Sequence, residues 1–507
     1  MSGSVSEMIA FLCYLCVVLG VGVYFFLRGR KQKNHGDKDY FLGGRQMNGW
    51  VAALSAGASD MSAWVLMGLP GSIYLLGLGQ VWISVGLFLG TAAAWIFIAP
   101  RLRRASIRAN DAITVPQFLS GRFLSKSHVL QVICAVIFII AYCVYSASSI
   151  VACGDLFHTI FGVDKTWTMA IATIIILIYT LLGGFDAVCW TDFFQGLLML
   201  AALMATPIIA CFVMKTGDFT PLAAVETGEN YYNLLSSGKF DWKSISDILS
   251  GLGWGLGYFG MPHILVRYMS IKSEKEMKKS RIIGISWTTL ILFMASVVGL
   301  VGHEYLGTYL DAGSKSLVFV TMVRDICPPL IAGLLLSAIL AASMSTADSQ
   351  LLASSSAFAS DVYKPLLRKK LFKIEEDSDK GMMAAGRIVV AVISVVAFLI
   401  AVNPGCQGIM ALVECAWAAF GAAFGPTIIL ALYWKRFTYK GAVAGIVTGF
   451  VVDAVWYAFL SGPTGLYEII PGFIASFVAA VAVSLFDHEP SKEVVALFEE
   501  SIKPTED

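Results

Sequence analysis

The residues best suited to chemistry lie in the stretch SAGASDMSAWVLMGLP, which runs from Ser55 to Pro70. It places a carboxylate, Asp60, among serines and small residues in a segment apolar enough to cross a bilayer. An ionised carboxylate at bilayer depth costs about 3 kcal/mol or more, and small polar residues weaken a helix. We therefore expect a helix that is interrupted here, with its freed carbonyl and hydroxyl oxygens facing a cavity. The alternative is a tightly packed interior helix with one satisfied aspartate.

A second apolar stretch also has the composition of an interrupted helix. It reads GLGWGLGYFGMPHIL and contains five glycines followed by Pro262, and both residue types disfavour a continuous helix. Trp254 and Tyr258 are four residues apart and share one helix face. Two interrupted helices in matching places, five crossings apart, are typical of secondary transporters with inverted repeats, whose site lies between them. Close helix packing is the alternative explanation of the glycines.

A third stretch concentrates hydroxyl groups in an apolar segment, LLLSAILAASMSTADSQLLASSSAFASD. Ser345 and Ser349 share a face with Ala342, while Thr346 adjoins them and Asp348 lies within the same cluster. Clustered hydroxyl and carbonyl oxygens suit a hard monovalent cation such as Na⁺, whereas a transition metal favours sulfur or imidazole ligands. The chain has six histidines, and none of them is paired. The pattern therefore favours a sodium site.

Two further crossings carry polar side chains at depth. Asp192 lies two turns into the sixth crossing, and an interaction with the helix N-terminus is the competing interpretation of this acid. In the fourth crossing, Tyr145 and Ser149 share a face that is more polar than a lipid-facing one. Hydrogen bonding between helices would explain the same pattern.

The composition places these residues in a membrane protein. Of the 507 residues, 57% are hydrophobic and 14% are charged, whereas roughly a quarter would be charged in a soluble protein. The net charge of +1 gives no sign of nucleic-acid binding. Cys13 and Cys16 form a CxxC pair inside an apolar segment without a second pair nearby, so metal or redox use is not indicated. The sequence offers neither a nucleophile–base pair nor a metal cluster, so we expect no enzyme and no cofactor apart from a coupling ion.

The apolar segments predict an all-α polytopic membrane protein. With about 20 apolar residues per crossing, we expect about thirteen transmembrane helices. Lysine and arginine are concentrated in alternate loops, for example at 101–108 and 272–281. Because short cytoplasmic loops are rich in these residues, we expect the N-terminus outside and the C-terminus in the cytoplasm. The expected crossings are 7–27, 48–70, 74–100, 127–155, 166–183, 187–214, 245–269, 282–304, 327–362, 385–402, 406–434, 441–461 and 467–486.

Seven motifs that occur in order make the chain resemble a known family. Together they resemble the sodium:solute symporter family, and within it they are most similar to the bacterial sodium/proline symporters. The similarity extends from about Tyr40 to Lys435, and the last two crossings are less distinctive. The motifs are YFLGGR, ALSAGASDMSAWVLMGLPG, VPQFLSGRF, WTDFFQ, GWGLGYFGMPHIL, LLLSAILAASMST and CAWAAFGAAFGP.

The resemblance implies a leucine-transporter-type fold, which consists of two inverted five-helix repeats with broken helices. Residues 47–434 would form the transporter core, with repeats at about 47–215 and 244–434. Residues 1–46 would add an N-terminal helix and a cytoplasmic loop. Residues 435–507 would add two C-terminal helices and a cytoplasmic tail.

The resemblance also implies roles for individual residues, because in such proteins a sodium site joins the broken first core helix to the eighth. The sodium ligands would be the backbone oxygens of Ala58, Met61 and Ala342 and the hydroxyls of Ser345 and Thr346. The positions that match residues for sodium coupling or for a second cation site in some relatives are Asp60, Ser62 and Asp192. The positions that match proline contacts are Tyr145, Trp254, Tyr258 and Pro262.

Two positions depart from the pattern of the proline carriers. Ala63 stands where they have glycine, which could narrow the site or shift its affinity. Asp348 stands where they carry a small hydroxyl residue. Together with Ser349 and a facing Asp192, it could form a second cation site or take up a proton. The sodium stoichiometry is therefore left open.

We predict a sodium-coupled symporter that imports L-proline across a bacterial plasma membrane by alternating access. Its partners would be proline, sodium and the lipid bilayer, with no nucleic acid and no obligate protein partner. The alternative within this class is another small solute, such as a betaine-type osmolyte or a short carboxylate, because aromatic side chains could also enclose a quaternary ammonium. A membrane sensor of this family would carry a signalling domain, for which the tail after Asp487 is too short.

Overall fold

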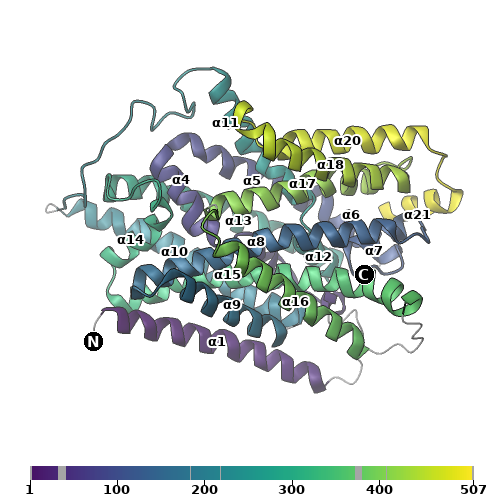
Figure 1. Ribbon diagram of the computed structural model, residues 1–507, viewed down its shortest axis with the longest axis horizontal. Coiled ribbons are helices and arrows are strands. Elements are labelled where there is room, and N and C mark those ends of the chain that lie inside the picture. Colours follow the sequence, from purple (N-terminus) through teal and green to yellow (C-terminus); the bar gives the residue numbers. More distant parts are fainter. Residues whose placement is uncertain are drawn as a thin grey trace.

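Long helices lying side by side build almost the whole molecule (Figure 1). The computed structural model describes residues 3–31, 41–182, 184–216, 219–371, 379–406 and 408–504. Within these ranges it contains helices and connecting turns, and no strand beyond an isolated bridge between Met47 and Ile271. The all-α architecture predicted from the sequence is confirmed.

Ten helices in the described part of the chain are long and apolar enough to cross a membrane. Each coincides with an expected crossing, and the three remaining crossings are the shorter helix α9 (Lys165–Leu182) and two interrupted helices. The ten are α1 (Gly3–Lys31), the segment Leu78–Arg108 with α5 (Val81–Ala93) and α6 (Ala99–Arg108), α8 (Val129–Phe161), α10 (Phe185–Lys215), α13 (Glu274–Leu306), α15 (Pro329–Ala357) with its continuation to Leu366, α16 (Asp379–Ala401), α17 (Ile409–Tyr433), α18 (Tyr439–Phe459) and α20 (Ile469–Phe486).

The first interrupted helix consists of α3 (Gly49–Asp60), a π-helical turn (Trp64–Gly68) and α4 (Leu69–Leu76). Asn48 caps α3, because its side-chain oxygen accepts hydrogen bonds from the backbone N–H groups of Trp50 and Val51 at 3.0 Å each. At Met61 the backbone leaves the helical region, with ψ at 42°. The helix is therefore interrupted at the small and polar residues, as the sequence predicts.

The second interrupted helix consists of α11 (Trp242–Gly253), a 3₁₀ turn (Trp254–Phe259) and α12 (Pro262–Ser270). A glycine is required where the turn meets a neighbouring ring, since a Cβ at Gly257 would lie 2.0 Å from the Nε1 atom of Trp417. The proline that starts α12 lacks an N–H group, which the first turn of a helix does not need for its own hydrogen bonds. This interruption also confirms the prediction from the sequence.

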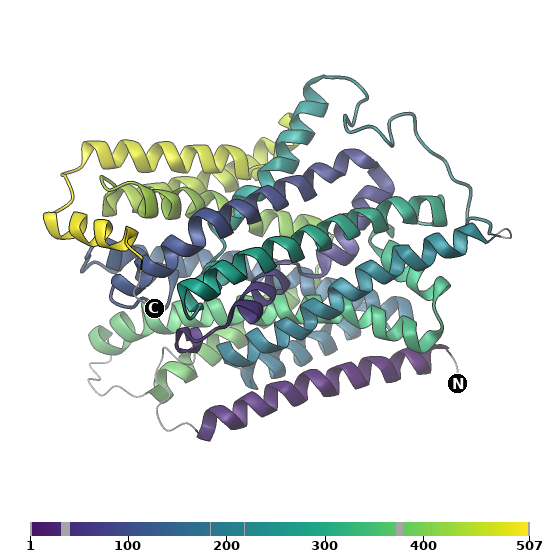
Figure 2. The ribbon, with the colours of Figure 1, turned by 180° about the vertical axis from the view of Figure 1, so that it is seen from behind.

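The two interrupted helices occupy equivalent places in two runs of five crossings. The first run comprises α3–α4, α5–α6, α8, α9 and α10, and the second comprises α11–α12, α13, α15, α16 and α17. α3 packs against α10, α12, α13 and α15, which places the first break in the core. α1 precedes the two runs and α18 and α20 follow them, at opposite edges of the bundle (Figure 1 and Figure 2).

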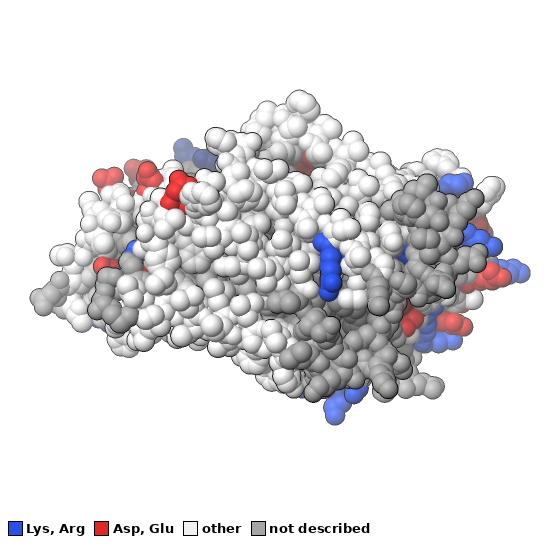
Figure 3. Space-filling model, turned by 60° about the horizontal axis from the view of Figure 1, so that its bottom comes forward, with Lys and Arg blue, Asp and Glu red and all other residues white. Residues whose placement is uncertain are grey.

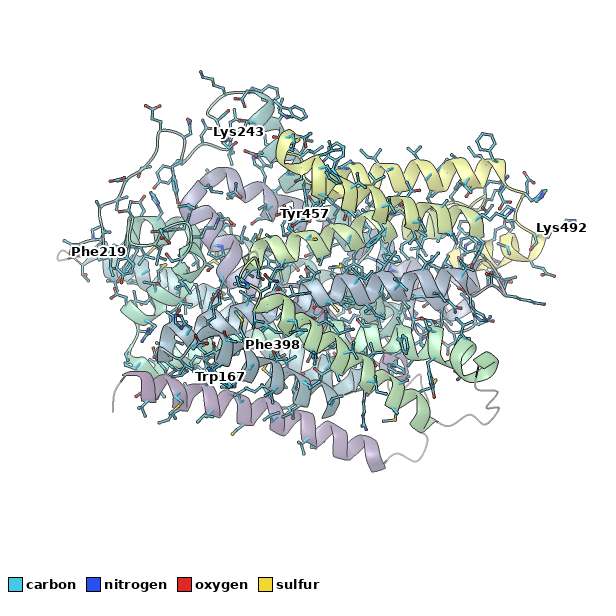
Figure 4. The ribbon with its side chains drawn as sticks, in the orientation of Figure 1. Trp167, Phe219, Lys243, Phe398, Tyr457 and Lys492 are labelled. Atoms are coloured by element: carbon cyan, nitrogen blue, oxygen red, sulfur yellow. The ribbon has the colours of Figure 1, made fainter. Side chains whose placement is uncertain are left out.

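One end of the bundle is rich in Lys and Arg. It carries α6, the short helix α7 (Val115–Arg122) and the helix α21 (Lys492–Ile502), at the right of Figure 1. Blue side chains gather there in Figure 3, while most of the visible surface between the two ends is uncharged. Large apolar side chains such as Phe293 on α13 and Ile388 on α16 are exposed, as expected of a multi-pass membrane protein. We call the end that carries α6, α7 and α21 the basic end, and Lys492 marks it in Figure 4.

The opposite end, which we call the vestibule end, contains the start of α1 and the helix α14 (Val318–Ile326), and Phe219 marks it in Figure 4. A cavity of about 670 Å³ lies here, lined by α8, α9, α17 and the loops that precede α14 and α17. Gly68 of the first interrupted helix and Met410 of α17 form part of its wall. The cavity therefore reaches the half of the interrupted helix that follows the break.

Candidate functional site

The first break is joined to α15 through a serine hydroxyl. The Ser345 hydroxyl donates to the carbonyl oxygen of Ala58 on α3 at 2.8 Å, and the carbonyl oxygen of Ala342 lies 3.2 Å from the same hydroxyl. Thr346 is fully buried, and its hydroxyl has no hydrogen-bond partner within the described ranges. Met61, at which α3 ends, is also fully buried. The structure thus brings three of the predicted sodium ligands into contact, with the other two adjoining them; we call this place the neutral junction.

The neutral junction offers carbonyl and hydroxyl oxygens in a buried environment. Such oxygens suit a hard cation like Na⁺. A buried hydroxyl without a partner costs about 1 to 3 kcal/mol, and Thr346 carries one among the described residues. A cation held here would satisfy Thr346 and link α3 to α15. The donor set therefore fits the predicted ion, and the assignment stays a prediction.

Asp60 connects the first interrupted helix to two other helices. Its Oδ2 atom accepts a hydrogen bond from the Tyr258 hydroxyl, and its main-chain carbonyl accepts one from the Tyr145 hydroxyl at 3.2 Å. Its Oδ1 atom is buried without a partner in the part of the chain that the structure describes. Sequence reasoning assigned Asp60 to coupling and the two tyrosines to the substrate. The structure places all three together.

Aromatic rings surround the break in the second interrupted helix. The Trp254 ring lies 5.8 Å from the Trp64 ring and 6.4 Å from the Trp417 ring, measured between centroids. The Nε1 of Trp417 donates to the Trp254 carbonyl at 2.7 Å, and Tyr258 packs edge-on against Trp417 at 5.2 Å. All four residues are buried, and we call them the aromatic cluster. Asp60 adds one carboxylate to its edge through Tyr258.

The remaining predicted substrate contact, Pro262, lies on the other side of the second break. It begins α12 and lines a cavity of about 20 Å³ together with His263, Arg267 and Ser349. A space of this size holds about one water molecule. Pro262 follows the break, in a helix whose end is bound by α6 at the basic end, since Arg103 donates to the Ile271 carbonyl at 2.6 Å. Trp254 lies before the break.

A group of charged and hydroxyl side chains lies one helical turn closer to the basic end than the neutral junction does. Arg267 of α12 and Asp192 of α10 form an ion pair at 3.0 Å, with both side chains almost completely buried. The Ser55 hydroxyl of α3 donates to Asp192 at 2.7 Å, and the Nε of Arg267 donates to Ser55 at 2.8 Å. Arg267 also donates to the Ser349 hydroxyl, which donates to Asp348 at 3.2 Å. We call these five residues the charged cluster.

Sequence reasoning selected Asp192, Asp348 and Ser349 for this cluster and missed Arg267. The structure brings the three selected residues together, while a cation bound between the two acids stays a prediction. An arginine inside a crossing is itself a signal, because ionisable residues at bilayer depth are rare and mostly functional. Arg267 lies two residues after Leu265, the end of the glycine-rich stretch, so the sequence itself carries this signal.

Ser62 and Ala63 form the turn of the first break. The Ser62 N–H donates to the Asp60 carbonyl at 2.9 Å, and the Ser62 hydroxyl accepts from the N–H of Trp64 at 3.4 Å. Both Ser62 and Ala63 are buried. Through these contacts Ser62 helps to shape the break. It lies beside Asp60, and the resemblance implied a coupling role for both residues.

Comparisons with known proteins agree with this geometry. The model of the sodium:solute symporter family matches residues 40–449 of the chain. The osmoregulated proline transporter OpuE of Bacillus subtilis is 40% identical over 497 residues, which cover 98% of each chain. A sodium/proline symporter of Staphylococcus aureus is 41% identical over 486 residues, which cover 94% of this chain and 92% of that protein.

Solved structures share the fold. A Na⁺-coupled sialic acid symporter in a substrate-bound, outward-open state matches with a TM-score of 0.76 at 20% identity, covering 96% of this chain and 99% of the other. A nucleobase-cation-symport-1 family transporter in a closed conformation matches with a TM-score of 0.56 at 14% identity, covering 91% and 98%. At these identities the likeness concerns the fold alone. It confirms the leucine-transporter-type architecture expected from the sequence.

Proposed function

Because the chain belongs to the sodium:solute symporter family, we propose that it is a sodium-coupled symporter that imports L-proline across the plasma membrane by alternating access. The observation that carries this proposal is the contact at 2.8 Å between Ser345 and Ala58, which joins the interrupted helix to α15 through oxygens that suit Na⁺. Relatives that are similar over nearly their full length are named as a proline transporter and a sodium/proline symporter. The family and these relatives are transporters, not enzymes.

Sodium would couple to the substrate by completing the neutral junction. Its ligands would be the carbonyl oxygens of Ala58, Met61 and Ala342 and the hydroxyls of Ser345 and Thr346. An ion bound there holds α3 against α15, so that less ordering is left when the substrate binds. The coupling free energy is reciprocal, and proline must therefore raise the sodium affinity by the same factor.

The aromatic cluster is the proposed proline site. Trp254 and Tyr258 would cover the apolar face of the pyrrolidine ring, since aromatic rings combine a large apolar surface with a polar edge. The substrate carboxylate would bind N–H groups that are freed where the two helices are interrupted. Tyr145 and Tyr258 both contact Asp60, which links this site to the helix that carries the ion ligands. Pro262 would contribute from the other side of the break.

The sodium gradient provides enough free energy for strong accumulation. One sodium ion that moves through about 100 mV gains about 2.3 kcal/mol. A tenfold concentration ratio of sodium adds about 1.4 kcal/mol. The sum of about 3.7 kcal/mol supports roughly a 500-fold proline gradient per sodium if coupling is tight.

The charged cluster is the proposed place of an additional cation or proton. It holds the carboxylates of Asp192 and Asp348 and one guanidinium, that of Arg267, so one negative charge is left over when all three are ionised. One carboxylate oxygen of each acid is buried without a hydrogen-bond partner in the described ranges. Since a buried uncompensated charge is costly, an ion or a proton would stabilise this arrangement.

The Asp348→Ser substitution tests the additional ion. We expect the charge moved per proline to fall by about one elementary charge, because the excess carboxylate that attracts the second cation is gone. The ratio of current to labelled uptake in the same proteoliposomes measures this charge. An unchanged ratio would remove the second ion from the mechanism and leave the neutral junction as its site of coupling.

We propose that the basic end faces the cytoplasm and that the vestibule end faces the outside. Lysine and arginine at the ends of α6 and α7 follow the rule that cytoplasmic loops are positively charged. The cavity of about 670 Å³ would then receive solutes from the outside. A Lys492→Cys variant should react with an impermeant maleimide only in inside-out vesicles.

Uptake of labelled L-proline into proteoliposomes tests the central proposal. We expect accumulation with an inward sodium gradient, blocked by unlabelled proline and unaffected by betaine or sugars. The control replaces sodium by potassium at the same membrane potential and should show no accumulation. Sodium-driven uptake of a betaine-type osmolyte or a short carboxylate in place of proline would reassign the aromatic cluster. Proline accumulation that continues without sodium would contradict sodium coupling.

A further inference from the structure

One side chain connects both interrupted helices to their neighbours near the basic end. Arg267 on α12 donates to the His263 carbonyl of its own helix at 2.7 Å and to Ser55 on α3 at 2.8 Å. It also donates to Asp192 on α10 at 3.0 Å and to Ser349 on α15. Its guanidinium is planar and carries five N–H donors, which allows one side chain to bond to four helices at once.

The molecule is closed where Arg267 lies. The cavity that Arg267 lines has a volume of about 20 Å³, whereas the cavity at the vestibule end has about 670 Å³. The guanidinium also lies over the ring of Phe185, the first residue of α10, at 5.6 Å from its centroid. The contacts of Arg267 join the half-helices α3 and α12 to the continuous helices α10 and α15.

We propose that Arg267 is the gate residue at the basic end. It holds α3 and α12 against α10 and α15 and thereby closes a passage between these helices, from the aromatic cluster to the basic end. This passage opens only when the guanidinium leaves Asp192 and Ser349. α3 ends at a break and α12 begins at one, so each can tilt as a short rigid unit while the continuous helices stay in place. A buried ion pair separates only when water can hydrate both charges, which the opening of the passage provides. The place of this gate in a transport cycle rests on the proposed function.

The gate and the neutral junction act on the same two helices. Ser55 lies three residues before Ala58 on α3, and Ser349 lies four residues after Ser345 on α15. Each residue of the gate is therefore one turn nearer to the basic end than its counterpart in the junction. An ion at the junction holds α3 against α15 and favours the closed gate. By reciprocity, loss of the gate contacts must weaken ion binding.

Cysteine labelling tests the gate without any measurement of transport. Cys189 is fully buried on α10, three residues before Asp192 and on the side of the basic end. In a chain that retains Cys189 as its single cysteine, Arg267→Gln should raise the rate of labelling by an impermeant maleimide at least about tenfold. The increase should occur only with reagent at the basic end. Arg267→Lys keeps the charge and should restore part of the protection, and sodium should slow labelling of the parent.

Two controls distinguish a local opening from general loosening. Arg122 is as buried as Arg267, at 2% exposure, but it donates to backbone carbonyls of α17 and α21 at the basic end. Arg122→Gln should leave the labelling of Cys189 unchanged. Cys153 is buried on α8 towards the vestibule end. As the single cysteine in an Arg267→Gln chain, it should stay protected.

Unchanged labelling of Cys189 in a folded Arg267→Gln chain would overturn the proposal, and so would equal labelling from both ends. If this variant does not accumulate in the membrane, Ser349→Ala replaces it, because that change removes one acceptor and keeps the ion pair. It should raise labelling about two- to threefold, and no increase would overturn the proposal. A tenfold increase for Arg267→Gln in a chain that does not respond to sodium would keep the gate and contradict sodium coupling.

Discussion

Two polar contacts attach α3 to its surroundings one helical turn apart, and they differ in charge. At the neutral junction, Ser345 and Ala58 present a hydroxyl and a carbonyl oxygen. In the charged cluster, Asp192 is already paired with Arg267 at 3.0 Å. The first offers neutral oxygens that an ion from solution can complete, whereas the second already pairs Asp192 with a guanidinium of the protein itself and leaves Asp348 as its uncompensated acid. The neutral junction can therefore be completed by sodium without breaking any ion pair, whereas the Asp192–Arg267 pair has to be separated by a movement of the helices.

Burial makes this difference in charge energetically large. The side chains of Asp192 and Arg267 are 0% and 2% exposed. In such an environment a lone charge is much more costly than a lone hydroxyl, because a charge loses far more hydration free energy when it leaves water. Substitutions in the neutral junction and in the charged cluster should therefore differ in the size of their effects and in the property that they change.

The largest effect is expected when the ion pair is broken. Arg267→Gln should destabilise the protein by about 3 to 5 kcal/mol, because Asp192 is left buried with an unpaired charge. Thermal unfolding in detergent, followed by tryptophan fluorescence, measures this loss. The double variant Arg267→Gln with Asp192→Asn should lose less unfolding free energy than the sum of the losses in the two single variants, since neither charge then remains alone. A double variant with an additive loss would show that the two side chains do not depend on each other.

A smaller effect is expected when the aromatic cluster is opened while the neutral junction stays intact. Trp254→Ala should raise the proline concentration for half-maximal uptake by about 10- to 100-fold, because a buried aromatic contact is lost. Sodium binding in the absence of substrate should be largely retained. Trp167→Ala is the matched control, since Trp167 is 68% exposed at the start of α9 (Figure 4). Sodium binding that falls as much as proline uptake would show that the two sites cannot be separated.

The next effect concerns the neutral junction itself. Ser345→Ala removes the hydroxyl that contacts Ala58 and should raise the sodium concentration for half-maximal activation by about tenfold, or about 1.4 kcal/mol. Substrate preference should not change. Ser337→Ala is the control, because Ser337 is buried on the same helix and donates within it, to Gly333 at 2.8 Å. Normal sodium activation of the Ser345→Ala protein would refute the ion site.

The smallest effect is expected where the same kind of ion pair lies at the surface. Lys440 and Asp487 are 2.8 Å apart at the basic end, with side chains 69% and 14% exposed. The hydrogen bond from Lys440 lowers the pKa of Asp487 below its ordinary value. The stabilisation is therefore complete above the ordinary aspartate pKa of about 3.9 and is lost as the pH falls through the lowered value.

Asp487→Asn should accordingly destabilise the protein by less than about 1 kcal/mol at neutral pH. The difference between variant and parent should vanish in acid, below the lowered pKa of Asp487. Unfolding scans of both proteins at several pH values measure this difference. A loss as large as that of Arg267→Gln would mean that burial does not decide the strength of these pairs.

Local composition was sufficient to predict where the helices are interrupted. Glycine, proline and small polar residues weaken a helix through the backbone of the segment that contains them. The interruptions at Met61 and before Pro262 therefore followed from single stretches of sequence. The approximate number of crossings followed from the length and apolarity of each segment, for the same reason.

The partners of individual side chains were harder to predict, because they depend on how helices are rotated against each other. Ala58 and Asp60 are two residues apart and point in different directions around α3. The Ala58 carbonyl meets a serine 287 residues away, and Asp60 meets Tyr258, which is 198 residues away. The family resemblance implied that Ala58 binds sodium and that Asp60 acts in coupling, but it did not contain the contact of Asp60 with the aromatic cluster.

By itself, the sequence determined which residues are too polar to face lipid and where a helix cannot continue, since both are properties of one segment in a known solvent. Only the tertiary structure decided that Asp192 meets the guanidinium of Arg267, which is 75 residues away. That contact exists because α3, α10, α12 and α15 pack with their polar faces together. The rotation of each helix is fixed by its apolar contacts with all the others, and no single segment carries that information.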